Sequence, residues 1–153
     1  MTEPTRADFF AKNTLGITTT LTDIQDTISF LDDWEERYSY IIDLGRQLPG
    51  LPEADKVEEN YIHGCQSQVW IVHQLDPETG RLFLLVDSDA MIVKGLAAIV
   101  LVAYNGKTPR EILDLDIEAV FEELDLIRHL SPTRGNGLRS MVRRIRSLAE
   151  QYC

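Results

Sequence analysis

The sequence is poor in the residues that build disulfides and metal sites. It has two cysteines, Cys65 and Cys153, and three histidines spread over positions 63, 73 and 129. Two thiols and three scattered imidazoles do not supply four ligands at the spacing of a structural zinc site, so we expect no metal and no cofactor on this chain. Both cysteines are predicted to be free thiols, because the chain shows no secretion signal and intracellular thiols stay reduced.

Positive charge and long apolar runs are also scarce. The chain has 15 Lys and Arg against 25 Asp and Glu, a formal net charge of -10. Nucleic acids and anionic membranes repel such a chain at long range, so neither is an expected partner. No run approaches the roughly 20 apolar residues that span a bilayer. We therefore expect a cytoplasmic protein with a neutral or basic protein partner.

The chain length and apolar content suit one compact domain. The 153 residues are 44% hydrophobic, which is enough to bury a core without staples. Residues 1–20 are expected to form a weakly ordered N-terminal extension, and residues 21–153 a single domain. Within it, apolar positions recur at helical spacing over 22–31 and 33–48, which predicts two helices.

A change to branched and aromatic residues predicts a β-hairpin in the middle of the chain. Its strands are expected at 69–72 and 81–86, on either side of the turn-forming residues 76–80. Residues 61–62 are candidates for a third short strand. The sheet would then be antiparallel, and Cys65 would lie between strands or at a sheet edge.

Helices are predicted over the rest of the chain. A long apolar segment at 89–105 indicates a buried helix, and shorter helices are expected from Thr108 and at 117–124. A final amphipathic helix is expected over about 131–151. The predicted fold class is α+β, with helices packed on a small antiparallel sheet.

Cys65 is the residue in this pattern that can carry chemistry. It stands between Gly64 and the polar residues 66–68, a setting that suits an accessible loop thiol able to exchange or transfer sulfur. The alternative is a small apolar residue packed under the hairpin. His63 is a formal partner for a cysteine hydrolase, but no orienting carboxylate or oxyanion-hole motif is evident in the sequence.

Two further places carry candidate supporting residues. Asp87 or Asp89 is expected to cap the buried helix, or else Asp89 bonds in the loop that holds the cysteine. Arg134 could lower the pKa of a nearby thiol or bind an acidic surface. Gly135 and Gly137 cost stability inside a helix, which indicates close backbone approach there.

Four motifs stand in a fixed order along the chain. They are Trp-Glu-Glu-Arg-Tyr at 34–38, Gly-Cys-Gln-Ser-Gln-Val-Trp-Ile-Val at 64–72, Asp-Ser-Asp-Ala with Ile-Val-Lys-Gly-Leu at 87–96, and Ser-Pro-Thr-Arg with Gly-Leu at 131–138. Together they resemble the SufE family of sulfur acceptors, from about residue 32 to residue 148.

The resemblance implies a SufE-like fold similar to the iron-sulfur scaffold IscU, with no bound metal. It implies that Cys65 accepts persulfide sulfur from a SufS-like cysteine desulfurase, stimulates that enzyme, and relays sulfur to an iron-sulfur scaffold complex. The protein would then be a carrier and activator rather than an enzyme, and the pyridoxal phosphate would belong to the desulfurase. Asp89 and Arg134 would shape the loop and the docking surface. The residues lining the approach to the cysteine would be Gln66, Ser67 and Gln68.

Departures from the family pattern are few. Val86 stands where the family commonly has glycine, and Cys153 is additional. Two other hypotheses for the function compete with this one. The chain could be a paralogous acceptor that serves another desulfurase, or an allosteric adaptor in which Cys65 is structural. A monomer and a homodimer are both compatible with the sequence.

Overall fold

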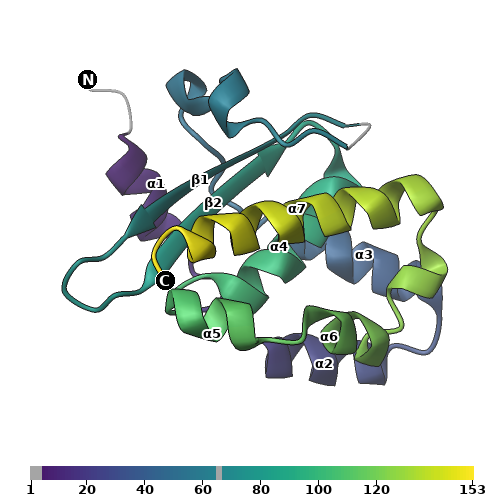
Figure 1. Ribbon diagram of the computed structural model, residues 1–153. Helices are drawn as coiled ribbons and strands as arrows, with labels where there is room; N and C mark the ends of the chain where they lie inside the picture. The colour runs from purple at the N-terminus through teal and green to yellow at the C-terminus, as the bar shows by residue number, and fades with distance from the viewer. Residues whose placement is uncertain (1–4, 65–66) are drawn as a thin grey trace.

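The computed structural model describes residues 5–64 and 67–153 (Figure 1). Its two strands are consecutive in the chain, with helices before and after them, as the α+β prediction requires. Their order is α1 (Arg6–Lys12), α2 (Leu21–Phe30), α3 (Trp34–Gly45), the 3-10 turns η1 (Glu53–Asp55) and η2 (Glu58–Asn60), β1 (Val69–Leu75), β2 (Leu82–Ser88), α4 (Met91–Tyr104), α5 (Pro109–Asp114), α6 (Ile117–Glu123), the 3-10 turn η3 (Ile127–His129) and α7 (Pro132–Glu150).

The predicted hairpin is confirmed and is slightly longer than expected. β1 and β2 pair antiparallel, with Val69 opposite Ser88 at one end and Leu75 opposite Leu82 at the other. In the described part of the chain the sheet has two strands. The predicted third strand is wrong, because Tyr61 makes only an isolated bridge to Trp70. A single bridged residue is too short to count as a strand.

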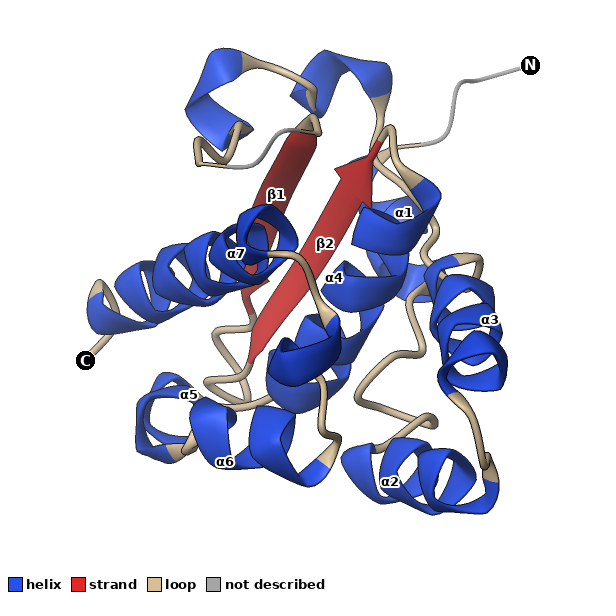
Figure 2. Cartoon of the chain, turned by 90° about the vertical axis from the view of Figure 1, so that its right-hand side faces the viewer, coloured by secondary structure: helices blue, strands red, loops and turns tan. Residues whose placement is uncertain are grey.

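Helix α4 forms the centre of the core. Its residues from Gly95 to Tyr104 are all buried, since α4 packs against β2, α3 and α7. α7 crosses one side of the molecule, and α2 and α6 lie together at the end away from the hairpin (Figures 1 and 2). The sheet is thus one layer, and the helices make the rest of the structure.

Two glycines allow α3 and α4 to approach closely. A Cβ on Gly45 would lie 2.6 Å from the backbone nitrogen of Gly95, and a Cβ on Gly95 would lie 2.4 Å from the carbonyl oxygen of Ile41. Real Cβ atoms do not come this close to backbone atoms. The contact between these helices therefore depends on glycine at both positions.

Helix boundaries follow the capping chemistry of the sequence. Side chains of Thr20, Asp33, Thr108 and Ser131 cap α2, α3, α5 and α7. The predicted aspartate cap of α4 is wrong. Ala90 occupies that position, and no described side chain caps the helix.

The N-terminal segment, expected to be weakly ordered, packs against the rest of the protein over its described residues. Leu15 is 0% exposed and belongs to the main core. The Asn13 side chain donates to the carbonyl of Leu84 (2.9 Å), and the Asn105 side chain accepts from the Leu84 amide (2.8 Å) and donates to the Leu15 carbonyl (2.8 Å). The division of the chain at residue 20 stays a prediction.

No helix within residues 5–64 and 67–153 is long and apolar enough to cross a membrane.

Candidate functional site

The cysteine loop, residues 63–68, follows the bridged residue Tyr61 and Ile62 and leads to β1. Cys65 and Gln66 lie outside the described residues, so their predicted roles stay predictions. Gly64 has φ +95, and a Cβ there would lie 2.8 Å from the Ser140 Oγ. This end of the loop therefore passes close to α7, and its backbone angle favours glycine.

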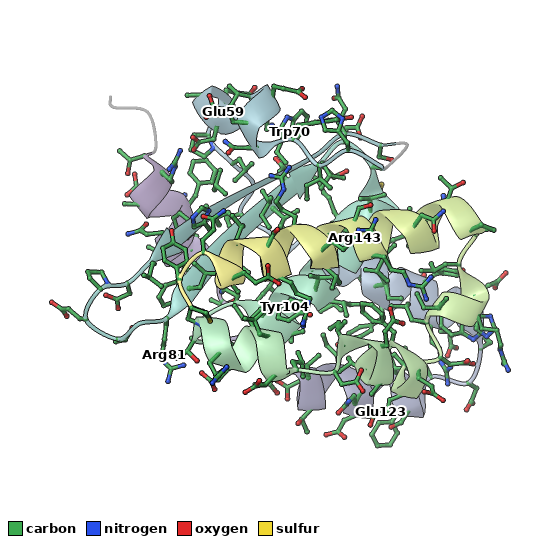
Figure 3. All side chains as sticks on the ribbon, viewed as in Figure 1. Glu59, Trp70, Arg81, Tyr104, Glu123 and Arg143 are labelled. Carbon is green, nitrogen blue, oxygen red and sulfur yellow. The ribbon has the colours of Figure 1, made fainter. Side chains whose placement is uncertain are left out.

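Hydrogen bonds fix the chain on the N-terminal side of the loop. The Ile62 amide donates to the Val69 carbonyl (2.8 Å), and the Arg144 side chain donates to the Tyr61 carbonyl (2.8 Å). The Tyr61 ring packs edge-on against Trp70, with 6.0 Å between centroids. Nearby on α7, Arg143 donates to the Ser140 Oγ (3.1 Å; Figure 3). The bonds of Ile62 and Tyr61 hold the chain between the hairpin and α7, whereas the bond from Arg143 to Ser140 lies within α7.

Asp89 fixes the other side of the loop. Its carboxylate Oδ1 accepts from the Gln68 amide (3.0 Å), and its own amide donates to the Gln68 carbonyl (3.3 Å). This pairing explains why Asp89 does not cap α4, because its carboxylate faces the loop instead. Of the two roles that the sequence allowed for Asp89, the bond in the cysteine loop is the observed one.

A cavity of about 280 Å³ lies between the loop and the first turns of α4 and α7. It brings together Ser67 and Arg134, two of the predicted site residues, and its wall is made of both polar and apolar side chains. The Arg134 amide donates to the Ser131 Oγ (3.3 Å), which is the cap of α7. The lining residues are Ser67, Ala90, Ile92, Val93, Leu96, Ser131, Thr133, Arg134, Gly137, Leu138 and Met141.

His63 has a carboxylate partner that the sequence did not reveal. Its Nε2 lies 2.6 Å from the Glu58 Oε1, and the side chains are 71% and 78% exposed. The expectation that His63 lacks an orienting carboxylate is therefore wrong. The pair lies in solvent, where a carboxylate holds an imidazole only weakly.

Asp87, the other candidate cap of α4, lies between two lysines instead. Its side chain is 12% exposed and lies 3.4 Å from the Lys56 Nζ and 3.5 Å from the Lys94 Nζ. The pKa of Lys56 is raised, chiefly by its hydrogen bond to Glu53 and also by the negative charge of Asp87. The alternation of β2 was the available signal, since it puts Asp87 on the face opposite Val86.

Comparison with known proteins identifies the chain. The SufE family, described as an Fe-S metabolism associated domain, matches residues 22–149. This chain belongs to the SufE family. An uncharacterized SufE-like protein of Rhizobium meliloti (strain 1021) is 49% identical over 134 residues, which are 86% of this chain and 96% of that protein. Another from Rhizobium etli is 50% identical over 132 residues, 85% of this chain and 89% of that protein.

The fold of this SufE protein is also found in a solved structure. The solution structure of a hypothetical protein from Thermus thermophilus matches with a TM-score of 0.70, over 86% of this chain and 94% of that chain, at 19% identity. The resemblance predicted from the four motifs is confirmed, and the SufE match extends beyond them at the N-terminal end. Helix α1 lies outside the range that the family matches.

Proposed function

We propose that this SufE protein accepts persulfide sulfur on Cys65 from a SufS-like, pyridoxal-phosphate-dependent cysteine desulfurase, raises the turnover of that enzyme, and passes the sulfur to an iron-sulfur scaffold complex. The observation that carries the proposal is the position of Cys65. It is the one cysteine within residues 22–149, the range that matches a family of Fe-S metabolism. Cys153 lies beyond that range and is exposed.

The proposed transfer is a thiol exchange that balances without an oxidant. The Cys65 thiolate attacks the outer sulfur of the desulfurase persulfide, and the bond between the two persulfide sulfurs breaks. Cys65 then carries the persulfide, and the desulfurase cysteine leaves as a thiolate. The pyridoxal phosphate stays with the desulfurase, where it generates the first persulfide.

Three features of the described residues support this role. Asp89 holds Gln68, which follows the cysteine closely in the chain. The cavity beside Ser67 measures about 280 Å³. That is several times the roughly 30 Å³ share of one water molecule, so it has room for an additional sulfur atom. Arg134 at its rim offers a cation to an acidic partner surface.

The net charge of -10 fits the rest of the proposal. It disfavours nucleic acid and membrane partners and favours a protein partner, in the cytoplasm where thiols stay reduced. The protein would act as a carrier and an activator and not as a free-standing hydrolase.

Intact-mass analysis tests the proposal. The protein is incubated with a cysteine desulfurase, pyridoxal phosphate and cysteine, as wild type, Cys65→Ser and Cys153→Ser. We expect a gain of about one sulfur atom that persists in Cys153→Ser, is absent in Cys65→Ser and reverses with a reductant.

The adaptor hypothesis predicts a different result. Desulfurase turnover would rise equally with wild type and Cys65→Ser, and no mass gain would appear. That outcome would remove sulfur transfer from the proposal.

A further inference from the structure

Helix α1 precedes the residues that match the SufE family and packs against the segment leading to the cysteine loop. It lies outside the family's matched range, yet it contacts β2 and η1 (Figures 1 and 2). All seven residues of α1 are described, and none of them is buried. A seven-residue helix is not stable alone in water, so α1 exists through its contacts with the rest of the protein.

The strongest polar contact of α1 is an ion pair with η1. The Arg6 Nε donates to the Asp55 Oδ2 (3.0 Å), and the Arg6 Nη2 bonds the other carboxylate oxygen. The Asp55 side chain is 11% exposed and that of Arg6 is 51% exposed. Because the carboxylate is nearly buried, the removal of Arg6 would leave it with an uncompensated charge.

Aromatic side chains add an apolar contact on the same face. Phe9 and Phe10 pack against a small buried cluster made of Leu51, Val72 and Leu85. Leu51 begins the segment that contains η1 and η2, and the other two belong to the hairpin. Helix α1 therefore contacts both the segment that begins at Leu51 and the hairpin.

A continuous set of contacts runs from Asp55 to the cysteine loop. The Asn60 side chain donates to the Asp55 carbonyl (2.8 Å), which ties η2 to η1. The Lys56 Nζ lies over the ring of Trp70, 5.7 Å from its centroid; Trp70 is labelled in Figure 3. Tyr61 follows, and its ring packs on Trp70. The next described residues are those that open the cysteine loop.

We propose that α1 is a regulatory strap, in which Arg6 and Asp55 act as positioning residues that hold residues 51–60 against the hairpin, next to the described residues that open the cysteine loop. Release of α1 would speed the reactions of Cys65, including sulfur acceptance. The regulatory meaning rests on the proposed function, but the strap itself does not. Because Arg6 is half exposed, salt weakens the strap.

Alkylation of Cys65 by the uncharged reagent N-ethylmaleimide tests the strap with no desulfurase present. All proteins carry Cys153→Ser, so that Cys65 is the one thiol. We expect Arg6→Gln and Asp55→Asn each to raise the alkylation rate about threefold to fivefold, in proportion to the loss of a partly exposed ion pair. The double variant should be no faster than either single variant.

Matched controls separate positioning from general destabilisation. Arg46→Gln breaks the exposed pair Arg46–Asp43 away from the strap and should leave the rate unchanged. Arg6→Lys keeps the charge and should restore most of the wild-type rate. Raising the salt concentration from about 0.05 M to about 0.5 M should raise the alkylation rate of wild type towards that of Arg6→Gln. The alkylation rate of Arg6→Gln should not change with salt.

Hydrogen exchange completes the test. Amides of residues 53–60 should exchange faster in Arg6→Gln than in wild type at equal melting temperature. Equal alkylation rates in wild type, Arg6→Gln and Asp55→Asn would overturn the proposal, as would faster exchange with no change in alkylation. Because these assays use no desulfurase, a failed strap is distinguished from a failed proposed function, which the mass experiment reports.

Discussion

The contact between α3 and α4 and the cysteine-loop end of the molecule are built in opposite ways. At the first, two glycines let the helix backbones come so close that no Cβ fits, and α4 is buried from Gly95 to Tyr104. At the second, a few polar bonds hold an exposed chain, such as the two hydrogen bonds between Asp89 and Gln68. Apolar packing distributes stability over many atoms, whereas a single hydrogen bond can break without loss of the fold.

The difference suits a protein that must keep its frame while one loop reacts. The core should tolerate almost no added volume, and the loop end should respond locally to the loss of one polar group. Three predictions test this contrast.

The largest effect is expected at the close helix contact. Gly95→Ala places a Cβ 2.4 Å from the Ile41 carbonyl oxygen, so α3 and α4 must separate. We expect a loss of about 2–4 kcal/mol in the free energy of unfolding, measured by urea denaturation.

Gly135→Ala is the matched control, because that glycine also lies in a helix. A Cβ there would meet no described atom within 4 Å, so the close approach expected from sequence is not found at Gly135. This variant should stabilise the protein by about 0.5–1 kcal/mol. Equal losses from both substitutions would contradict the contrast between the two regions.

A smaller and local effect is expected at Asp89. Asp89→Ala removes the acceptor of the Gln68 amide, so that amide should exchange about fivefold faster, as expected for the loss of a hydrogen bond worth about 1 kcal/mol. Hydrogen exchange resolved to Gln68 measures it. Asp89→Asn keeps an acceptor oxygen and should behave more like wild type. A general rise in exchange across α4 would instead show that Asp89 supports the core.

The smallest effect is a pH dependence at His73 on β1, which belongs to neither region. The pKa of His73 is lowered from its usual 6.5, chiefly because the ring is partly buried and also because Arg6 is positively charged. The unfolded chain therefore binds this proton at a higher pH than the folded protein does. Stability is complete above the unfolded pKa and falls as pH drops through the folded pKa.

The measurement compares wild type with His73→Gln by thermal unfolding between about pH 7.5 and about pH 5. Wild type should lose more stability over that range than the variant. An identical slope in both proteins would show that His73 keeps an ordinary pKa.

The sequence predicts the apolar parts of this fold well because their signals are local. Hairpin, turn and most helix boundaries follow from periodicity and capping residues within a few positions of each other. The role of Asn13 was missed because its partner, Leu84, lies 71 residues away. The same limit hid the position of Asp87 between Lys56 and Lys94.

The candidate site was predicted unevenly for the same reason. Ser67 and Arg134 line one cavity, although they are far apart in sequence, because their motifs resemble those of one family. The aspartate cap of α4 was a local prediction and was wrong, since Asp89 bonds Gln68, 21 residues away. Local chemistry could not decide between those two partners.

The two asparagines at Leu84 also bear on how the protein avoids aggregation. An edge strand exposes a backbone amide and carbonyl to which a strand of another molecule can add. At Leu84 the side-chain carbonyl of Asn105 and the side-chain amide of Asn13 occupy both groups, as a neighbouring strand would. At this position the edge of β2 is therefore closed to intermolecular pairing without the cost of a third strand.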